Sequence, residues 1–221
     1  AAAPSRPEPR ARRERRKREP TTAAPTPAPA APPERDPRRG LYLRAALGVG
    51  PRIGSISNTT DTQLDQADLS LSGWGPALDI AMGWAVAPGF VIGGGLFLDW
   101  TSRPTLAAEY NGRRVEATQE HYRLTSFGPF VDWYPKRSTL GLHIEGGIGV
   151  GLGSFAGDLP ATVVDRSASG VTFFLGTGYE WRIAGALAIG ALLRLTGAAL
   201  ASDTEAHGLF SPSLLLSFTW F

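Results

Sequence analysis

After residue 39, large apolar residues alternate with small or polar residues along most of the chain. A period of two is typical of β-strands, and clusters of Gly, Pro, Asn and Asp between the alternating segments mark turns. The pattern predicts eight strands, at about residues 40–50, 74–86, 89–100, 121–134, 139–152, 170–182, 186–197 and 209–221. Each has the roughly 9–11 residues that a tilted strand needs to cross a bilayer.

The two faces of these segments differ in a way that indicates which face meets lipid. In residues 139–152, Leu142, Ile144 and Ile148 share one face, and glycines occupy most of the other. A water-exposed face usually carries Lys and Glu, whereas small residues suit the crowded lumen of an eight-stranded barrel. We therefore expect an all-β, antiparallel, up-and-down transmembrane barrel with its apolar face toward lipid. A soluble lipocalin-like binder, with the apolar face inward, is the alternative.

A few charged residues interrupt the face of small residues, and we expect them to pair inside the lumen as a structural polar network. These residues are Arg44, Asp79, Asp99, Asp132, His143, Glu145, Glu180 and Arg194. A closed network of this kind would block steady ion flow. A narrow porin-like channel is therefore an alternative function that conductance would reveal.

All six tryptophans lie at or near predicted strand ends, which matches two aromatic girdles at the membrane interfaces. One predicted girdle holds Trp74 and Trp100, and the other holds Trp84, Trp133, Trp181 and Trp220. Long connections, at about 51–73, 101–120, 153–169 and 198–208, alternate with short ones. Because periplasmic turns are short in such barrels, this alternation places both termini in the periplasm.

Residues 183–200 are long and apolar enough to suggest a membrane helix instead. Arg194 and several glycines within this stretch, together with seven other strand-like segments, argue against a helix.

Residues 1–39 form a separate tail that contains ten of the eighteen prolines and carries a net charge of +6, whereas residues 40–221 carry −4. The tail has too few apolar residues to fold, so we expect it to be disordered in the periplasm. Its basic run at 10–19 could bind an anionic partner or serve as a solvated linker. No aromatic residues are interleaved, so no nucleic acid is expected. The start at Ala1 fits removal of a signal peptide.

No catalytic, metal or cofactor site stands out. The absence of cysteine excludes thiol chemistry and disulfides. His143 and Glu145, two residues apart on the inward face, could form an acid–base pair, but membership of the polar network is the simpler interpretation. His121 and His207 have no second metal ligand at a diagnostic spacing. Asp61, Asp65 and Asp68 do not have the spacing of an EF-hand loop.

Residues 40–221 resemble the small outer-membrane β-barrel proteins of the OmpA-barrel and OmpX type. The resemblance rests on the eight-segment pattern, on Gly128-Pro129-Phe130-Val131-Asp132-Trp133-Tyr134 before a short turn, and on the final Phe221. It departs from the family at Thr219, where an aromatic residue is usual two places before the end.

The resemblance implies an outer-membrane location in contact with the lipid bilayer and lipopolysaccharide. It also implies that Phe221 belongs to the signal read by the outer-membrane assembly machinery. We expect a non-enzymatic structural or interaction role through the external loops. A lipid-modifying barrel enzyme is the remaining alternative.

Overall fold

The computed structural model describes residues 40–58, 69–110, 113–135, 141–156, 167–203 and 205–221. All of them belong to the second of the two units, Ala1–Glu34 and Arg35–Phe221, into which the chain divides. The predicted tail at 1–39 and the acidic residues Asp61, Asp65 and Asp68 lie outside the described residues.

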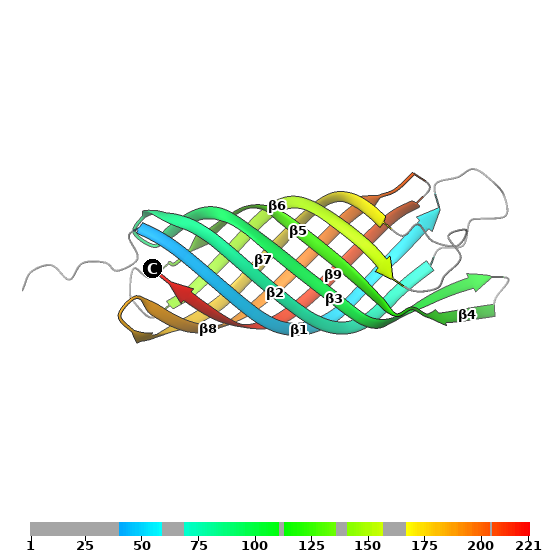
Figure 1. The fold of residues 1–221 in the computed structure, drawn as a ribbon, viewed down its shortest axis with the longest axis horizontal. Coiled ribbons are helices and arrows are strands. Elements are labelled where there is room, and N and C mark those ends of the chain that lie inside the picture. The colour runs from blue at the N-terminus through cyan, green and yellow to red at the C-terminus, as the bar shows by residue number, and fades with distance from the viewer. Residues whose placement is uncertain (1–39, 59–68, 111–112, 136–140, 157–166, 204) are drawn as a thin grey trace, which may run out of the picture. The chain divides into compact units, whose positions relative to one another are not determined.

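The described residues form a closed ring of antiparallel strands (Figure 1). The strands are β1 (Gly40–Asn58), β2 (Leu69–Ala87), β3 (Phe90–Tyr110), β4 (Arg113–Thr118), β5 (His121–Trp133), β6 (Gly141–Ala156), β7 (Ser167–Ala184), β8 (Leu187–Ala201) and β9 (Glu205–Trp220). The first strand, β1, pairs with both β2 and β9, which closes the ring. Both β4 and β5 pair with β3, so they are two parts of one wall strand. The predicted eight-stranded up-and-down barrel is confirmed.

An irregularity at Arg103 separates the two parts of that wall strand. Arg103 has a positive φ of 49°. Its N–H donates to the carbonyl of Glu120 over 2.9 Å, and the N–H of Gln119 donates to the carbonyl of Pro104 over 3.0 Å. Beyond this point, residues 105–110 of β3 pair with residues 113–118 of β4, while residues 105–108 of β3 also pair with residues 69–72 of β2, and the β3–β4 end projects at the rim of the barrel (Figure 1). We call this segment the β3–β4 ribbon.

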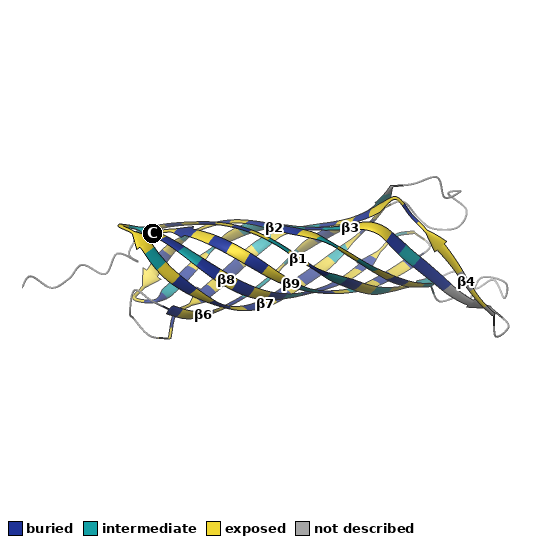
Figure 2. Ribbon diagram, turned by 90° about the horizontal axis from the view of Figure 1, so that it is seen from below, coloured by how far each residue is buried: buried dark blue, intermediate teal, exposed yellow. Residues whose placement is uncertain are grey.

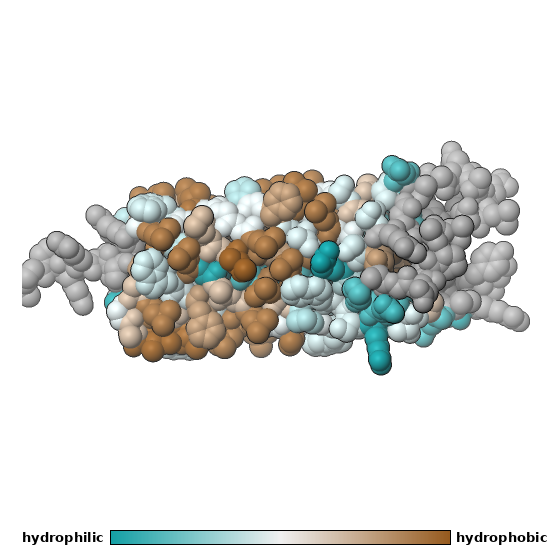
Figure 3. Space-filling view, in the orientation of Figure 1, coloured by the Kyte–Doolittle hydropathy of each residue, from teal (hydrophilic) through white to brown (hydrophobic). Residues whose placement is uncertain are grey.

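Buried residues alternate with exposed residues along every long strand (Figure 2), so one face of each strand points inward and the other outward. Large apolar residues dominate the outward face: Leu47, Met82 and Leu214 are each about three-fifths exposed. They form an apolar surface over the half of the barrel nearest the C-terminus, whereas the opposite end is more hydrophilic (Figure 3). The inward face carries the buried charged residues together with small and aromatic ones. The predicted assignment of the two faces is therefore confirmed.

The predicted strand lengths were wrong at the end of the barrel far from the C-terminus. Much of the expected long connections at 51–73, 101–120, 153–169 and 198–208 belongs to strands. The fourth of them shrinks to residues 202–204, between β8 and β9. In these extensions the alternation continues with fewer large apolar residues, because Ser, Thr, Ala and Gly also fit a paired strand that leaves the apolar band.

The helix considered for 183–200 does not form. Residues up to Ala184 end β7, Gly185 adopts a positive φ of 52° in a tight turn, and β8 begins at Leu187. No helix in the described part of the chain is long and apolar enough to span a bilayer.

Inward glycines leave room for large side chains from neighbouring strands. A substitution at Gly178, beside His143, tests whether this room is needed. A Cβ at Gly178 would overlap Nε2 of His143 and lie 2.8 Å from the carbonyl oxygen of Ala191. We expect Gly178→Ala to lower the free energy of unfolding by about 1–3 kcal/mol through overpacking. The melting temperature in detergent measures the loss.

The matched control is Gly94→Ala. Outside its chain neighbours, the nearest atom to a Cβ at Gly94 is the carbonyl oxygen of Gly128 at 3.8 Å, an ordinary contact. Equal melting temperatures for the two variants would show that the space beside His143 is not limiting.

Candidate functional site in the barrel lumen

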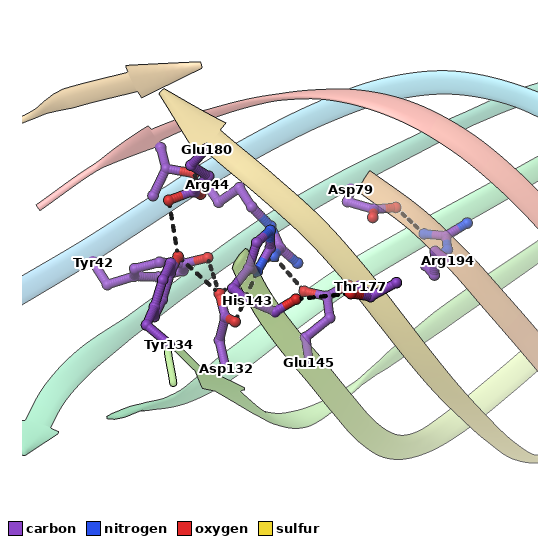
Figure 4. A network of polar contacts seen from close by, with 11 residues as sticks. Tyr42, Arg44, Asp79, Asp132, Tyr134, His143, Glu145, Thr177, Glu180 and Arg194 are labelled. Carbon is purple, nitrogen blue, oxygen red and sulfur yellow. Dashed lines mark hydrogen bonds and ion pairs between the residues drawn. The ribbon is translucent and has the colours of Figure 1, made fainter. Parts of the chain in front are cut away.

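The structure places all eight residues of the predicted polar network on the inward face, each at most 2% exposed. They come from seven strands, which the closed ring brings around one lumen, and all of them except Asp99 are labelled in Figure 4. They do not form one continuous network. Instead they divide into two layers, which we name the His143 layer and the Arg194 layer.

The His143 layer contains Tyr42, Arg44, Asp132, Tyr134, His143, Glu145 and Glu180 (Figure 4). Its centre is Asp132: Nδ1 of His143 lies 2.9 Å from one carboxylate oxygen, and the Tyr42 hydroxyl donates to the other over 3.0 Å. Arg44 forms ion pairs with both Asp132 and Glu145. The Asp132 carboxylate therefore links its own strand, β5, to β1 and β6.

Glu180 joins this layer through hydroxyl groups. The Tyr134 hydroxyl lies 3.1 Å from a carboxylate oxygen of each of Asp132 and Glu180. The Thr219 hydroxyl donates to Glu180 over 2.6 Å. The His143 layer therefore connects β5, β6 and β7 to the last strand, β9.

The Arg194 layer is an alternating row of charges across the lumen. The Arg194 guanidinium forms ion pairs with Asp79 and, over 2.7 Å, with Asp99. Asp99 also accepts a 2.8 Å hydrogen bond from Arg52. Arg52 donates further to the carbonyls of Gly50 and Pro76, over 2.7 and 3.1 Å. Two cations and two anions are brought together, so this layer is electrically balanced.

Several members of these layers were absent from the predicted network. Arg52 was assigned to a loop, although it continues the inward phase of Arg44, Ala46, Gly48 and Gly50. Tyr42 and Tyr134 also follow the inward phase of their strands, but neither is charged. The alternation of inward and outward positions was enough to identify the charged residues. Continuing this alternation past the expected end of the first strand identifies Arg52 as well.

The acid–base pair considered as an alternative for His143 and Glu145 does not form, and both belong to the polar network instead. His143 bonds to Asp132, whereas Glu145 bonds to Arg44. His207, predicted to lie near a loop, is buried on β9 and lies 3.0 Å from Glu205. His121, by contrast, is exposed.

Asp132, His143 and Glu145 are the one group among the described residues whose donor atoms could hold a metal ion. One ligand atom from each lies within 4.8 Å of the others. Arg44 already contacts both carboxylates in this group. A metal ion would have to displace or approach a buried guanidinium, and like charges at such distances repel strongly. The donor set therefore fits an arginine-centred ion pair better than a metal.

The chain is similar to solved structures of outer-membrane proteins. The outer membrane protein OprG from Pseudomonas aeruginosa aligns with a TM-score of 0.50 and 11% identity, covering 83% of this chain and 97% of that one. Neisserial surface protein A aligns at 0.48 and 12% identity, covering 82% and 96%, and outer membrane protein AlkL at 0.48 and 16% identity, covering 88% and 95%. No protein-family model and no curated protein sequence matches the chain.

The fold is that of the small outer-membrane β-barrels. The likeness to OprG carries this conclusion, and at 11% identity it extends to the fold alone.

The six tryptophans occupy two levels of this barrel. Trp84, Trp133, Trp181 and Trp220 lie near the end that carries the short turns, since Trp133 pairs with Phe90 and Trp220 with Leu187. Trp74 and Trp100 lie toward the other end, opposite Ser102 and Arg123. Five of the six are exposed, and Trp100 is partly buried. Their role as girdles remains a prediction.

Phe221 turns inward instead of joining the outward apolar residues. Its ring lies 5.4 Å from that of Tyr42 and 5.9 Å from that of Tyr134, centroid to centroid. Its N–H donates to the carbonyl of Ala186 over 3.1 Å. The departure at Thr219 has its structural counterpart here: Thr219 and Phe221 share the inward phase, and Trp220 takes the outward position.

We expect Arg194→Leu to destabilise the barrel, because it leaves Asp79 without its cation in a fully buried position. Removing one partner of a buried pair typically costs about 3–5 kcal/mol. Chemical denaturation of the barrel in detergent measures the loss.

The double variant Asp79→Leu/Arg194→Leu separates lost charge pairing from lost packing. It removes both charges and leaves the Arg52–Asp99 pair in place, so it should recover much of the stability. If the double variant is as unstable as Arg194→Leu, the loss of stability comes from packing and not from the unpaired charge of Asp79.

Proposed function

We propose that this chain is an outer-membrane barrel with a closed lumen, which acts as a structural or interaction protein through the part that extends beyond the membrane. The outward apolar surface supports insertion into lipid (Figure 3). Closure of the ring supports it as well, because each described strand except β4 pairs on both sides, and backbone groups need internal partners in lipid.

The main support for a structural or interaction role is that buried side chains fill the lumen. Arg194 is fully buried between Asp79 and Asp99, and the His143 layer adds a second barrier of fully buried side chains. Desolvated ion pairs that span the lumen leave little room for hydrated ions. This arrangement favours a plug over a pore.

The same burial argues for a non-enzymatic role. His143 and Glu145 are 0% and 1% exposed, so no substrate reaches them in this state. A lipid-modifying enzyme would need such groups on the outward surface. The partners that fit are the lipid bilayer, lipopolysaccharide and, during biogenesis, the assembly machinery that reads Phe221.

We assign both termini and the tail to the periplasm, because barrels of this kind have short periplasmic turns. The β3–β4 ribbon and the connections between the longer strand extensions would then face the outside.

Planar-bilayer recording tests the closed lumen. We expect the wild-type barrel to show no steady conductance, because both layers remain paired. A variant that removes both barriers, Arg44→Ala/Glu145→Ala/Asp79→Ala/Arg194→Ala, should conduct. Boiled and unboiled samples on a gel provide the control for folding, since a folded barrel migrates differently from the unfolded chain.

Steady conductance by the wild-type protein would instead favour the narrow channel. Solubility as a monomer without detergent would contradict the membrane barrel itself.

A further inference from the structure

The outer edge of β4 is free of strand partners in the described part of the chain. Within it, β4 pairs with β3 alone, at the end of the sheet order. The last described residue of the neighbouring wall strand β6 is Ala156, which lies opposite His121. A free edge presents unpaired N–H and C=O groups that can accept another strand.

The hydrogen bond at Gln119 identifies which residues present these groups. The Gln119 N–H donates to Pro104, so these two residues form a hydrogen-bonded position of the ladder. Hydrogen-bonded positions alternate along an antiparallel pair, and the same register continues to Tyr110 and Arg113. The backbone groups of Val115 and Ala117 therefore face β3, and those of Arg114, Glu116 and Thr118 face the free edge.

Two of these edge residues carry opposite charges. Arg114 and Glu116 have side chains that are 69% and 54% exposed, and Nε of Arg114 lies 2.7 Å from Oε1 of Glu116. Charged residues on an edge usually discourage pairing with another chain. Charges prevent two edges from pairing when like charges meet. The β4 edge carries one positive and one negative charge, so two copies of it can avoid such contacts.

The spacing of the two charges makes the edge complementary to itself. In an antiparallel pair centred on Val115, Arg114 of each copy lies opposite Glu116 of the other. Both residues have outward backbone groups, so each Arg114–Glu116 position is also hydrogen-bonded. Registers that place Glu116 opposite Glu116, or Arg114 opposite Arg114, bring like charges together and are disfavoured.

We propose that the β4 edge is a self-recognition site, at which a second copy of this chain adds its own β4 in antiparallel register. The two-fold axis of such a pair is perpendicular to the strands. Because the β3–β4 ribbon runs outward from the barrel rim, this axis lies across the barrel's long axis (Figure 1). The two copies therefore meet from facing membranes. The inference rests on the proposed location of the ribbon outside the membrane.

Vesicle clustering tests the proposal with the full-length protein. Two populations of phospholipid vesicles, one carrying a donor dye and one an acceptor dye, receive the same purified protein. We expect wild-type vesicles to cluster with one another and to transfer energy. Arg114→Glu alone and Glu116→Arg alone should each lose clustering, because like charges then meet at both positions.

Charge exchange provides outcomes that a general surface effect would not give. Arg114→Glu vesicles mixed with Glu116→Arg vesicles should cluster, although neither population clusters alone. The double variant Arg114→Glu/Glu116→Arg should cluster with itself and not with wild type. Arg123→Glu is the matched control, because Arg123 is exposed and forms no hydrogen bond or ion pair with the described residues. Its clustering should equal that of wild type.

Glu116→Pro tests the backbone contribution. It removes an N–H that faces the free edge and none that faces β3, so clustering should fall while the ribbon remains. Absence of wild-type clustering, or clustering that ignores the charge exchange, would overturn the proposal. Flotation of the vesicles and the gel mobility shift report membrane insertion separately, so failure of the membrane barrel is distinguishable from failure of self-recognition.

Discussion

The narrow lumen of an eight-stranded ring is the constraint on which the rest of this structure depends. Its interior is just wide enough for side chains, so each large inward residue needs an empty position beside it. The rings of Phe97 and Phe174 occupy the space beside Gly95 and Gly147, and the Glu145 side chain occupies the space beside Gly176. The abundant glycines are therefore positions that let charged and aromatic side chains meet at the centre.

The same crowding forces the inward charges to find partners at short range. In the Arg194 layer, residues from β1, β2, β3 and β8 share one row of ion pairs. Arg194 and Asp79 are separated by 115 residues in the chain. Such contacts depend on strand tilt and on the stagger between strands, so they join segments that only the completed ring brings together.

Strand positions and faces could be predicted from the sequence, because the period of two persists through each membrane-facing segment. The partners within the lumen could not, since a phase assigns a side chain to the interior without saying which other strand it reaches. His143 illustrates this: its neighbour in phase is Glu145, yet it bonds to Asp132 on β5. The strand ends could not be predicted where large apolar residues become rare. Arg52 was therefore assigned to a loop, although it belongs to β1.

The inward turn of Phe221 ties the end of the last strand to closure of the ring. The ring rests against Tyr42 on the first strand and Tyr134 beyond the fifth, two residues that come together only when the barrel closes. This aromatic contact therefore forms only in the completed ring, and it packs Phe221 against the buried cluster at that end of the lumen.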